Sequence, residues 1–375
     1  MAAAMVVQRR YPLKQLKVLA LTKYGRLGAS SRLRFLQFVA GLDQSGVHVT
    51  VQPLIPEAML KTRYAQGSYG VTGLVRAYAG RCQAMMSRQD FDLLWVEKEA
   101  LPWAPFWLER ALLQGRPYVL DYDDAVFHNY DQNARSWVRW FYGDRLDRLM
   151  AGAALVVSGN SYLATRAREA GAPRVEVIPT SIDLDHYPIQ PVAPPLRALR
   201  DTLPRIVWVG SPSTARYLDL LREPLQALAV RHSFALRLIG CDTVNIPGVQ
   251  VEVMPWSEAT EFDSISSCDI GIMPLLDSLW EQGKCGYKLI QYMACGLPVV
   301  ASLVGVNSEM VQSGRNGFLA RTSAEWVSAL GELLASQELR RVMGLAGRSS
   351  VESTYCIQKT GPRLGALLRS VATAY

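Results

Sequence analysis

The clearest indication of the fold class is the segment Lys284-Cys-Gly-Tyr-Lys-Leu-Ile-Gln-Tyr-Met-Ala-Cys-Gly-Leu-Pro-Val-Val-Ala-Ser302. It predicts a helix over Tyr287–Ala294 that ends at Cys295-Gly296, a good C-cap. Pro298 then starts a predicted strand over 298–301. A helix that runs directly into a short apolar strand is typical of an α/β domain with a parallel sheet.

The same alternation runs along the whole chain. Short β-branched apolar runs alternate with longer amphipathic stretches, which predicts parallel, doubly wound sheets. The predicted strands are 16–22, 47–53, 93–97, 118–121, 154–158, 175–179, 205–209, 235–239, 249–254, 270–274 and 298–301. The other predicted helices are 30–45, 71–86, 105–113, 135–151, 162–170, 215–231, 257–267, 324–335, 339–355 and 362–371.

A proline-rich interruption divides this alternation. Residues 182–204 are predicted to be an interdomain linker, because proline supplies no ladder donor and resists helix interiors. The 375 residues are therefore predicted to form a Rossmann-like domain over 1–181 and a second over 205–355. A C-terminal helix over 356–375 is expected to pack back on the first domain.

Composition excludes several classes of protein. Hydrophobic residues make up 49% and charged residues 19%, which is typical of a globular chain rather than a disordered one. The six cysteines lack C-x-x-C spacing and the four histidines are scattered, so no structural zinc site is expected. No apolar run approaches the roughly 18 residues of a membrane helix. The basic residues at the start of the chain come after its apolar patch, whereas a signal peptide has them before it. We expect a cytoplasmic protein.

Basic residues are unevenly placed. Residues 1–180 hold 23 Lys and Arg against 15 Asp and Glu, whereas 181–375 are close to neutral. Two interpretations stay open: solvated helix faces, or attraction to an anionic acceptor or to the anionic inner surface of the cytoplasmic membrane. Each basic residue gains roughly 1 kcal/mol near such a surface. The basic stretches carry no nucleic-acid motif, so nucleic acid is not an expected partner.

Two lysines flank the start of the helix predicted over Tyr287–Ala294. They are Lys284 and Lys288, in a loop that also contains Gly283 and Gly286. Helix N-termini carry unpaired N–H groups and a partial positive charge, so they bind phosphates well, and two ammonium groups strengthen such a site. The alternative for these residues alone is a capped surface helix with solvated lysines.

With its neighbours, this stretch resembles the retaining GT-B glycosyltransferases of family four. Their second domain carries E-x7-E followed by A-M-A-x-G-x-P-V-V-A, and the second part stands here as 292–301. Residues 305–311 and 313–319 also resemble the family's E-x-V and D-G-x-N-G-x-L segments. The resemblance implies two Rossmann-like domains facing a central cleft, with a nucleotide-sugar in the second domain and the acceptor in the first.

One feature departs from the family pattern. The two family glutamates fall on Gly283 and Gln291, and neither is acidic. Gln291 can still hydrogen-bond a ribose hydroxyl, since an amide both donates and accepts. Glu281 lies two residues before the first position and could replace it. We interpret the change as the feature of a bacterial subgroup with a modified E-x7-E region; a non-catalytic relative is the alternative.

Further donor-binding candidates follow predicted strands. Gly210 and Arg216 resemble the family's first loop in this domain, where glycine admits a diphosphate and arginine makes bidentate phosphate contact. Residues 253–256 resemble the family segment that borders the nucleobase, so Trp256 is a candidate to stack on the base. The alternative is that Trp256 belongs to the hydrophobic core, which is more common for tryptophan. In the first domain, Gly28 and Arg32 belong to a loop that faces the diphosphate and acceptor in the family.

Three acids, Asp121, Asp123 and Asp124, end the predicted strand over 118–121. Carboxylates this close shift one another's pKa, which favours a functional role. In family-four enzymes this strand end faces the sugar, so the three acids and Glu281 are the catalytic candidates. Two alternatives stay open: a D-x-D metal site as in GT-A glycosyltransferases, and the nucleophile of a haloacid-dehalogenase phosphatase.

The predicted function is transfer of a sugar from a nucleotide-sugar to a lipid-linked or cell-surface glycan acceptor, as in polysaccharide biosynthesis. The resemblance implies that the anomeric configuration is retained. Lysines, an arginine and a helix dipole are expected to stabilise the departing nucleoside diphosphate, so no metal and no cofactor are expected. The alternatives are a phosphohydrolase that uses Asp121 and Asp123, or a non-catalytic nucleotide-sugar-binding relative.

Overall fold

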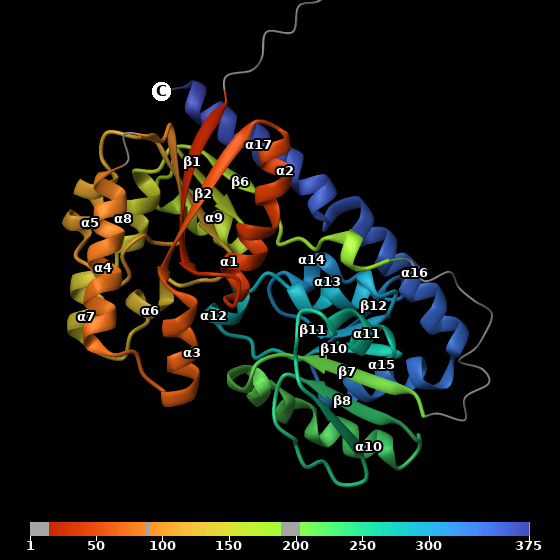
Figure 1. Ribbon diagram of the computed structural model, residues 1–375. Helices are drawn as coiled ribbons and strands as arrows, with labels where there is room; N and C mark the ends of the chain where they lie inside the picture. The colour runs from red at the N-terminus through yellow and green to blue at the C-terminus, as the bar shows by residue number, and fades with distance from the viewer. Residues whose placement is uncertain (1–14, 88–89, 189–202, 375) are drawn as a thin grey trace, which may run out of the picture. The chain divides into compact units, whose positions relative to one another are not determined.

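Two six-stranded parallel sheets flanked by helices form the protein in this computed structural model (Figure 1). The structure describes residues 15–87, 90–188 and 203–374. The two sheets confirm the predicted fold class, an α/β protein with two Rossmann-like, doubly wound sheets. Among the described residues, no helix is both long and apolar enough to cross a bilayer.

The first sheet has the strand order β2-β1-β3-β4-β5-β6. Its strands are β1 (Leu16–Tyr24), β2 (Val47–Ile55), β3 (Leu93–Glu97), β4 (Tyr118–Tyr122), β5 (Leu155–Ser158) and β6 (Val175–Val177). Each lies within two residues of its predicted bounds. The chain pairs β1 with both β2 and β3, so the direction of winding reverses between β1 and β3.

The second sheet has the strand order β12-β11-β10-β7-β8-β9. Its strands are β7 (Arg205–Val209), β8 (Ala235–Ile239), β9 (Gln250–Met254), β10 (Ile270–Met273), β11 (Val299–Ser302) and β12 (Gly317–Ala320). The sequence analysis did not predict β12. The first and fourth of these strands, β7 and β10, are neighbours, so the switch point of this sheet lies between them.

The connections between strands are mostly helical. In the first half they are α1 (Ala29–Arg34), η1 (Leu36–Phe38), α2 (Val39–Gln44), α3 (Glu57–Gln66), α4 (Val71–Met86), α5 (Phe106–Leu113), α6 (His128–Asp131), α7 (Ser136–Tyr142), α8 (Arg145–Ala151), α9 (Ser161–Glu169) and η3 (Leu184–His186). In the second half they are η4 (Pro212–Leu221), α10 (Arg222–Ala229), α11 (Glu261–Ser266), α12 (Leu279–Gln282), α13 (Tyr287–Ala294), α14 (Asn307–Met310), α15 (Ser323–Ala335), α16 (Gln337–Thr354) and α17 (Ile357–Thr373).

Three of the predicted helices are interrupted. The helix predicted over 30–45 becomes α1, η1 and α2, and the one predicted over 215–231 begins as the 3-10 helix η4. The helix predicted over 135–151 divides into α7 and α8 at Gly143, where an added Cβ would lie 2.3 Å from the Arg139 carbonyl oxygen. Local backbone packing decided where each of these helices ends.

The chain divides into two compact units. The first contains residues 1–121, 152–155 and 361–375, and the second contains 122–151 and 156–360. Most of α17 therefore joins the first unit, where Arg369 donates a hydrogen bond to the Ser45 carbonyl oxygen. The predicted linker, 182–204, lies largely outside the described residues.

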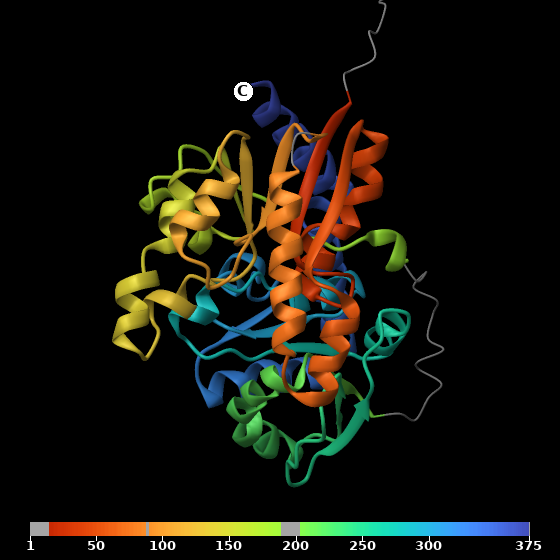
Figure 2. The ribbon, with the colours of Figure 1, turned by 60° about the vertical axis from the view of Figure 1, so that its left-hand side comes forward.

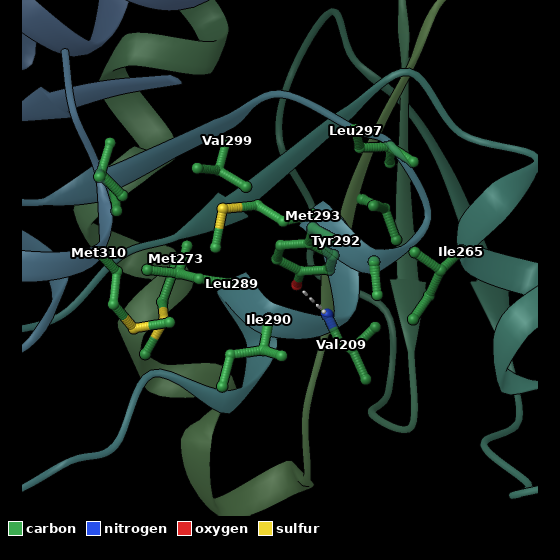
Figure 3. Close-up of a cluster of buried hydrophobic side chains, with 14 of the residues drawn as sticks. Val209, Ile265, Met273, Leu289, Ile290, Tyr292, Met293, Leu297, Val299 and Met310 are labelled. Atoms are coloured by element: carbon green, nitrogen blue, oxygen red, sulfur yellow. Dashed lines mark hydrogen bonds between the residues drawn. The ribbon is translucent and has the colours of Figure 1, made fainter. Parts of the chain in front are cut away.

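The core of the second unit surrounds α13. Figure 3 shows Tyr292 and Met293 of this helix among apolar side chains from β7, β10 and β11. Figure 2 shows the ribbon turned by 60°, with the strands of each sheet running side by side. Because Tyr292 and Met293 are fully buried, they hold α13 firmly against its sheet.

Candidate functional site

Two glycines lie at the carboxyl edge of the second sheet, where open α/β sheets bind ligands. Gly210 follows β7, and a Cβ there would lie 2.4 Å from the Trp208 ring. Gly240 follows β8 with a φ of 84°, and a Cβ there would lie 2.7 Å from the Gly210 carbonyl oxygen. Only glycine fits at either position, so the two loops pack closely at this edge.

Tyr292 fastens α13 to the same edge. Its hydroxyl accepts a 2.9 Å hydrogen bond from the backbone N–H of Val209, drawn as a dashed line in Figure 3. Its ring lies against Gly271 of β10, where a Cβ would lie 2.3 Å away. Burial raises the pKa of Tyr292 above the ordinary tyrosine value. The phenol therefore stays neutral, and its hydrogen bond ties α13 to the end of β7.

The two lysines singled out by the sequence lie at that start. Lys288 Nζ lies 5.5 Å from the centroid of the Trp208 ring, and Lys284 Nζ lies 5.9 Å from that of Trp280. Both are cation–π contacts. Burial, together with the positive charge of Lys284, lowers the pKa of Lys288 to about 8. The fold thus places two like charges close enough to oppose each other.

Glu281, in α12, organises the polar groups beside these lysines. Its buried carboxylate accepts hydrogen bonds from the hydroxyls of Ser278 and Tyr217, the latter at 2.5 Å. The exposed guanidinium of Arg216 lies 3.8 Å from it. Burial raises the pKa of Glu281, but the hydrogen bonds from Ser278 and Tyr217 outweigh burial and bring it below the ordinary value. Glu281 is therefore an ionised carboxylate beside Arg216.

The absence of the first family glutamate has a steric reason. A Cβ at Gly283 would lie 2.4 Å from the Ala125 Cβ and 2.7 Å from its backbone nitrogen. No side chain fits there without a shift of the backbone, and the replacement of this glutamate by Glu281, two positions earlier, stays a prediction. At the second family position, Gln291 is buried within α13.

Asp123 and Asp124 belong to the same compact unit as the lysines. The Asp124 carboxylate lies 3.8 Å from Lys284 Nζ, and both Asp123 and Asp124 are partly buried. Asn160 donates a 2.9 Å hydrogen bond to the Lys284 carbonyl oxygen, which fixes the loop before α13. Across the residues that the structure describes, no group of three or more His, Cys, Asp or Glu side chains is arranged to hold a metal ion.

Trp256, after β9, is held by a buried acid. Its indole N–H donates to Glu261 at 2.5 Å, and Glu261 also accepts from the Tyr187 hydroxyl at 2.7 Å. A Cβ added at Gly240 would lie 3.0 Å from the Cβ of Trp256. The ring is partly buried, so Trp256 has a defined orientation next to the glycine-containing edge.

Asp121 belongs to the first compact unit and has other partners. It accepts a 2.7 Å hydrogen bond from Arg34 Nε and a 3.4 Å one from the Trp95 indole. The Arg34 and Asp121 side chains are only 2% and 1% exposed. Such a buried ion pair engages the carboxylate inside the protein. The neighbouring acids therefore differ: Asp121 pairs with Arg34, whereas Asp124 faces Lys284.

Gly28 and Arg32 shape the loop between β1 and α1 in the first unit. A Cβ at Gly28 would lie 2.4 Å from the Tyr24 Cβ, so close packing requires glycine. Arg32 is partly buried, and its Nη1 donates to the Arg26 carbonyl oxygen at 3.1 Å. The prediction that these two residues bind the donor stays a prediction.

The sequence analysis missed two charged residues at the end of β3, Glu97 and Lys98. Glu97 is buried and accepts hydrogen bonds from the Ser31 hydroxyl at 2.6 Å and the Lys23 backbone N–H at 2.8 Å. Lys98 has a φ of 62°, which is uncommon for lysine, and its Nζ donates to Ser30 at 3.1 Å. β1 and β3 flank the switch point of the first sheet, so two consecutive charged residues where a buried strand ends were the available sequence signal.

Comparison with known families identifies one part of the chain. A family described as glycosyl transferases group 1 matches residues 203–336. Those residues are similar to a glycosyl transferases group 1 domain. This domain contains the switch point between β7 and β10, the two lysines, Glu281 and Trp256.

A curated relative shares only part of the chain. Spore coat protein SA of Bacillus subtilis (strain 168) is 31% identical over 75 residues, which cover 19% of this chain. The match spans 20% of the length of that relative.

Solved structures match nearly the whole chain. Sucrose-phosphate synthase from Thermosynechococcus elongatus has a TM-score of 0.67 at 17% identity, covering 96% of this chain and 100% of that one. HepE of Anabaena, solved in complex with UDP, has a TM-score of 0.67 at 15% identity, covering 95% and 100%. WaaG, a glycosyltransferase involved in lipopolysaccharide biosynthesis, has a TM-score of 0.66 at 15% identity, covering 94% and 99%. These likenesses confirm the predicted GT-B fold.

Proposed function

We propose that the protein is a glycosyltransferase that moves a sugar from a nucleotide-sugar to a glycan or lipid-linked acceptor, with retention of the anomeric configuration. One observation carries the proposal: two lysines, Lys284 and Lys288, lie at the start of α13, inside the segment that matches the glycosyl transferases group 1 family. Two ammonium groups held together cost free energy, and an anionic ligand between them turns that cost into binding.

In this proposal the second unit binds the donor. Lys284, Lys288 and the N-terminus of α13 contact the diphosphate, and Gly210 lets it approach the sheet edge. Glu281 positions Arg216, which adds a third cation. When the bond between sugar and phosphate breaks, negative charge grows on the leaving diphosphate, and these fixed positive groups stabilise it. The reaction then requires neither a metal nor another cofactor.

The remaining candidates take supporting roles. Trp256, held by Glu261, borders the nucleobase, and the Gln291 amide hydrogen-bonds the ribose. Asp124, next to Lys284, orients a hydroxyl of the sugar, as does Asp123. HepE was solved with UDP, so a uridine nucleotide is the first ligand to test.

Titration calorimetry with UDP and other nucleoside diphosphates tests the donor site. The Lys284→Ala/Lys288→Ala variant should bind the preferred diphosphate about 100-fold more weakly or worse, because each charged contact contributes roughly 1.5–3 kcal/mol. Lys359→Ala, which removes an exposed lysine of α17, is the matched control and should bind like the wild type. Equal affinity of the double variant and the wild type would contradict the site.

Product analysis tests the reaction. We expect an α-linked product from an α-linked nucleotide-sugar, measured by the anomeric proton coupling in NMR. Tight nucleotide-sugar binding without turnover across a panel of glycan and lipid-linked acceptors would favour the non-catalytic relative instead. The phosphohydrolase alternative is not favoured, because the carboxylate of Asp121 that it needs as nucleophile is engaged by Arg34.

A further inference from the structure

Helix α7 (Ser136–Tyr142), labelled in Figure 1, exposes three aromatic side chains. Trp140 is 84% exposed, Trp137 57% and Phe141 50%, whereas Val138 is only 2% exposed. Each helical residue turns the chain by about 100°, so Trp140 lies opposite Val138 and the three aromatic residues share the outer face. A surface helix usually turns its aromatic residues toward the core, whereas α7 turns these three toward solvent. We call this surface the outer face of α7.

The inner side of α7 is anchored. Val138 is buried, and the Tyr142 ring packs 5.9 Å from the ring of Tyr130 on α6. On the outer side, the ring centroids of Trp140 and Phe141 are 6.3 Å apart, so these two side chains form one aromatic surface. Because the helix is held by its inner residues, the outer face is a firm platform, and a contiguous exposed patch of this kind marks an interaction site.

Arginines flank this platform. Arg135, Arg139 and Arg148 are all exposed, and Arg139 donates hydrogen bonds to backbone carbonyl oxygens just before the helix. The exposed acid among them is Asp144, 3.9 Å from Arg148. Tryptophan and phenylalanine insert at the level of lipid headgroups, and arginine is attracted to anionic headgroups. Aromatic residues beside an excess of exposed arginines therefore match the chemistry of an anionic bilayer.

We propose that the outer face of α7 binds the surface of a lipid bilayer that carries anionic headgroups. Trp137, Trp140 and Phe141 enter the headgroup region, and Arg135 and Arg139 contact the lipid phosphates. The helix lies on the membrane and does not cross it, since it has seven residues. This inference is independent of the proposed glycosyltransferase reaction, because it concerns neither the lysine pair nor the donor.

Vesicle sedimentation of the full chain tests the proposal. Vesicles of phosphatidylcholine with phosphatidylglycerol should bind the wild type, and pure phosphatidylcholine should bind it much less. Trp137→Ser/Trp140→Ser should lower the partition coefficient about tenfold or more. Arg135→Gln/Arg139→Gln should lower it about fivefold for each arginine removed, and high salt should mimic that variant.

Val230→Ser is the matched control, because Val230 is an 85% exposed apolar residue at the end of α10. It should bind vesicles like the wild type, and circular dichroism melting should show that all variants fold. Three results would overturn the proposal: no binding of the wild type to anionic vesicles, unchanged binding of the tryptophan variant, or a wild-type dimer in analytical ultracentrifugation that the tryptophan variant abolishes. The last result would assign the face to a second copy of the chain.

Discussion

The two compact units differ in how their charged side chains are paired. In the first unit, Arg34 and Asp121 form a buried pair of opposite charges, each within hydrogen-bond distance of the other. In the second unit, Lys284 and Lys288 are like charges at the start of α13, and burial together with the charge of Lys284 lowers the pKa of Lys288 to about 8. The first arrangement is complete within the protein and holds the fold. The second places two cations beside Asp124, which lies 3.8 Å from Lys284, and a bound anion would stabilise the pair of cations further, which favours a binding site.

Breaking the buried pair should have the largest effect. Arg34→Ala leaves Asp121 charged, buried and without its main partner, which should lower the free energy of unfolding by about 3–5 kcal/mol. Urea denaturation followed by circular dichroism measures this loss. The matched control, Arg341→Ala, removes an exposed pair with Glu338 and should cost less than about 1 kcal/mol. Similar losses for both variants would show that the buried pair is not structural.

Removing one of the two like charges should not lower the free energy of unfolding, in contrast to breaking the buried pair. Lys288→Met keeps most of the apolar stem over Trp208 but removes the ammonium group. Stability should stay equal or rise, whereas nucleoside diphosphate affinity should fall by roughly 1.5–3 kcal/mol. Thermal melting and titration calorimetry on the same preparation separate the two effects. A variant that melts much earlier yet binds normally would make Lys288 a structural residue.

The space at Gly283 can be tested with a single methyl group. Gly283→Ala places a Cβ against the Ala125 backbone and should cost about 1–3 kcal/mol through overpacking. Gly41→Ala is the control, because a Cβ there meets nothing within 4 Å, and it should be neutral or slightly stabilising. If Gly283→Ala were as stable as the control, sterics would not explain the missing family glutamate.

The smallest predicted effect is the pH dependence of donor binding. Lys288 has a pKa of about 8, so its charge is present below that pH and is lost as the pH rises through it. Diphosphate affinity should therefore fall by up to about tenfold between pH 7 and pH 9, and binding near pH 8 should take up protons. Calorimetry in buffers of different ionisation enthalpy measures the uptake. The Lys288→Met variant should show neither effect.

Strand positions were the most predictable feature of the chain. Every predicted strand lies within two residues of its place, because β-branched apolar runs bounded by turns are a local signal. The helix start next to Lys284 and Lys288 was also predicted from a local signal, a glycine-containing loop that opens a helix. β12 was missed because Gly317–Ala320 is short and begins with glycine. Helix ends near Phe35 and Gly143 were missed because they depend on packing against neighbouring turns.

Local sequence signals were enough to predict the α/β alternation, the two parallel sheets and the cations at one helix start. The ion-pair partner of each acid became known from the three-dimensional structure. Asp121 finds Arg34 across 87 residues, whereas Asp124, three positions later, faces Lys284. The reason is physical: helix periods, caps and apolar runs act over a few residues, but the partner of a side chain depends on strand order, which the whole core selects.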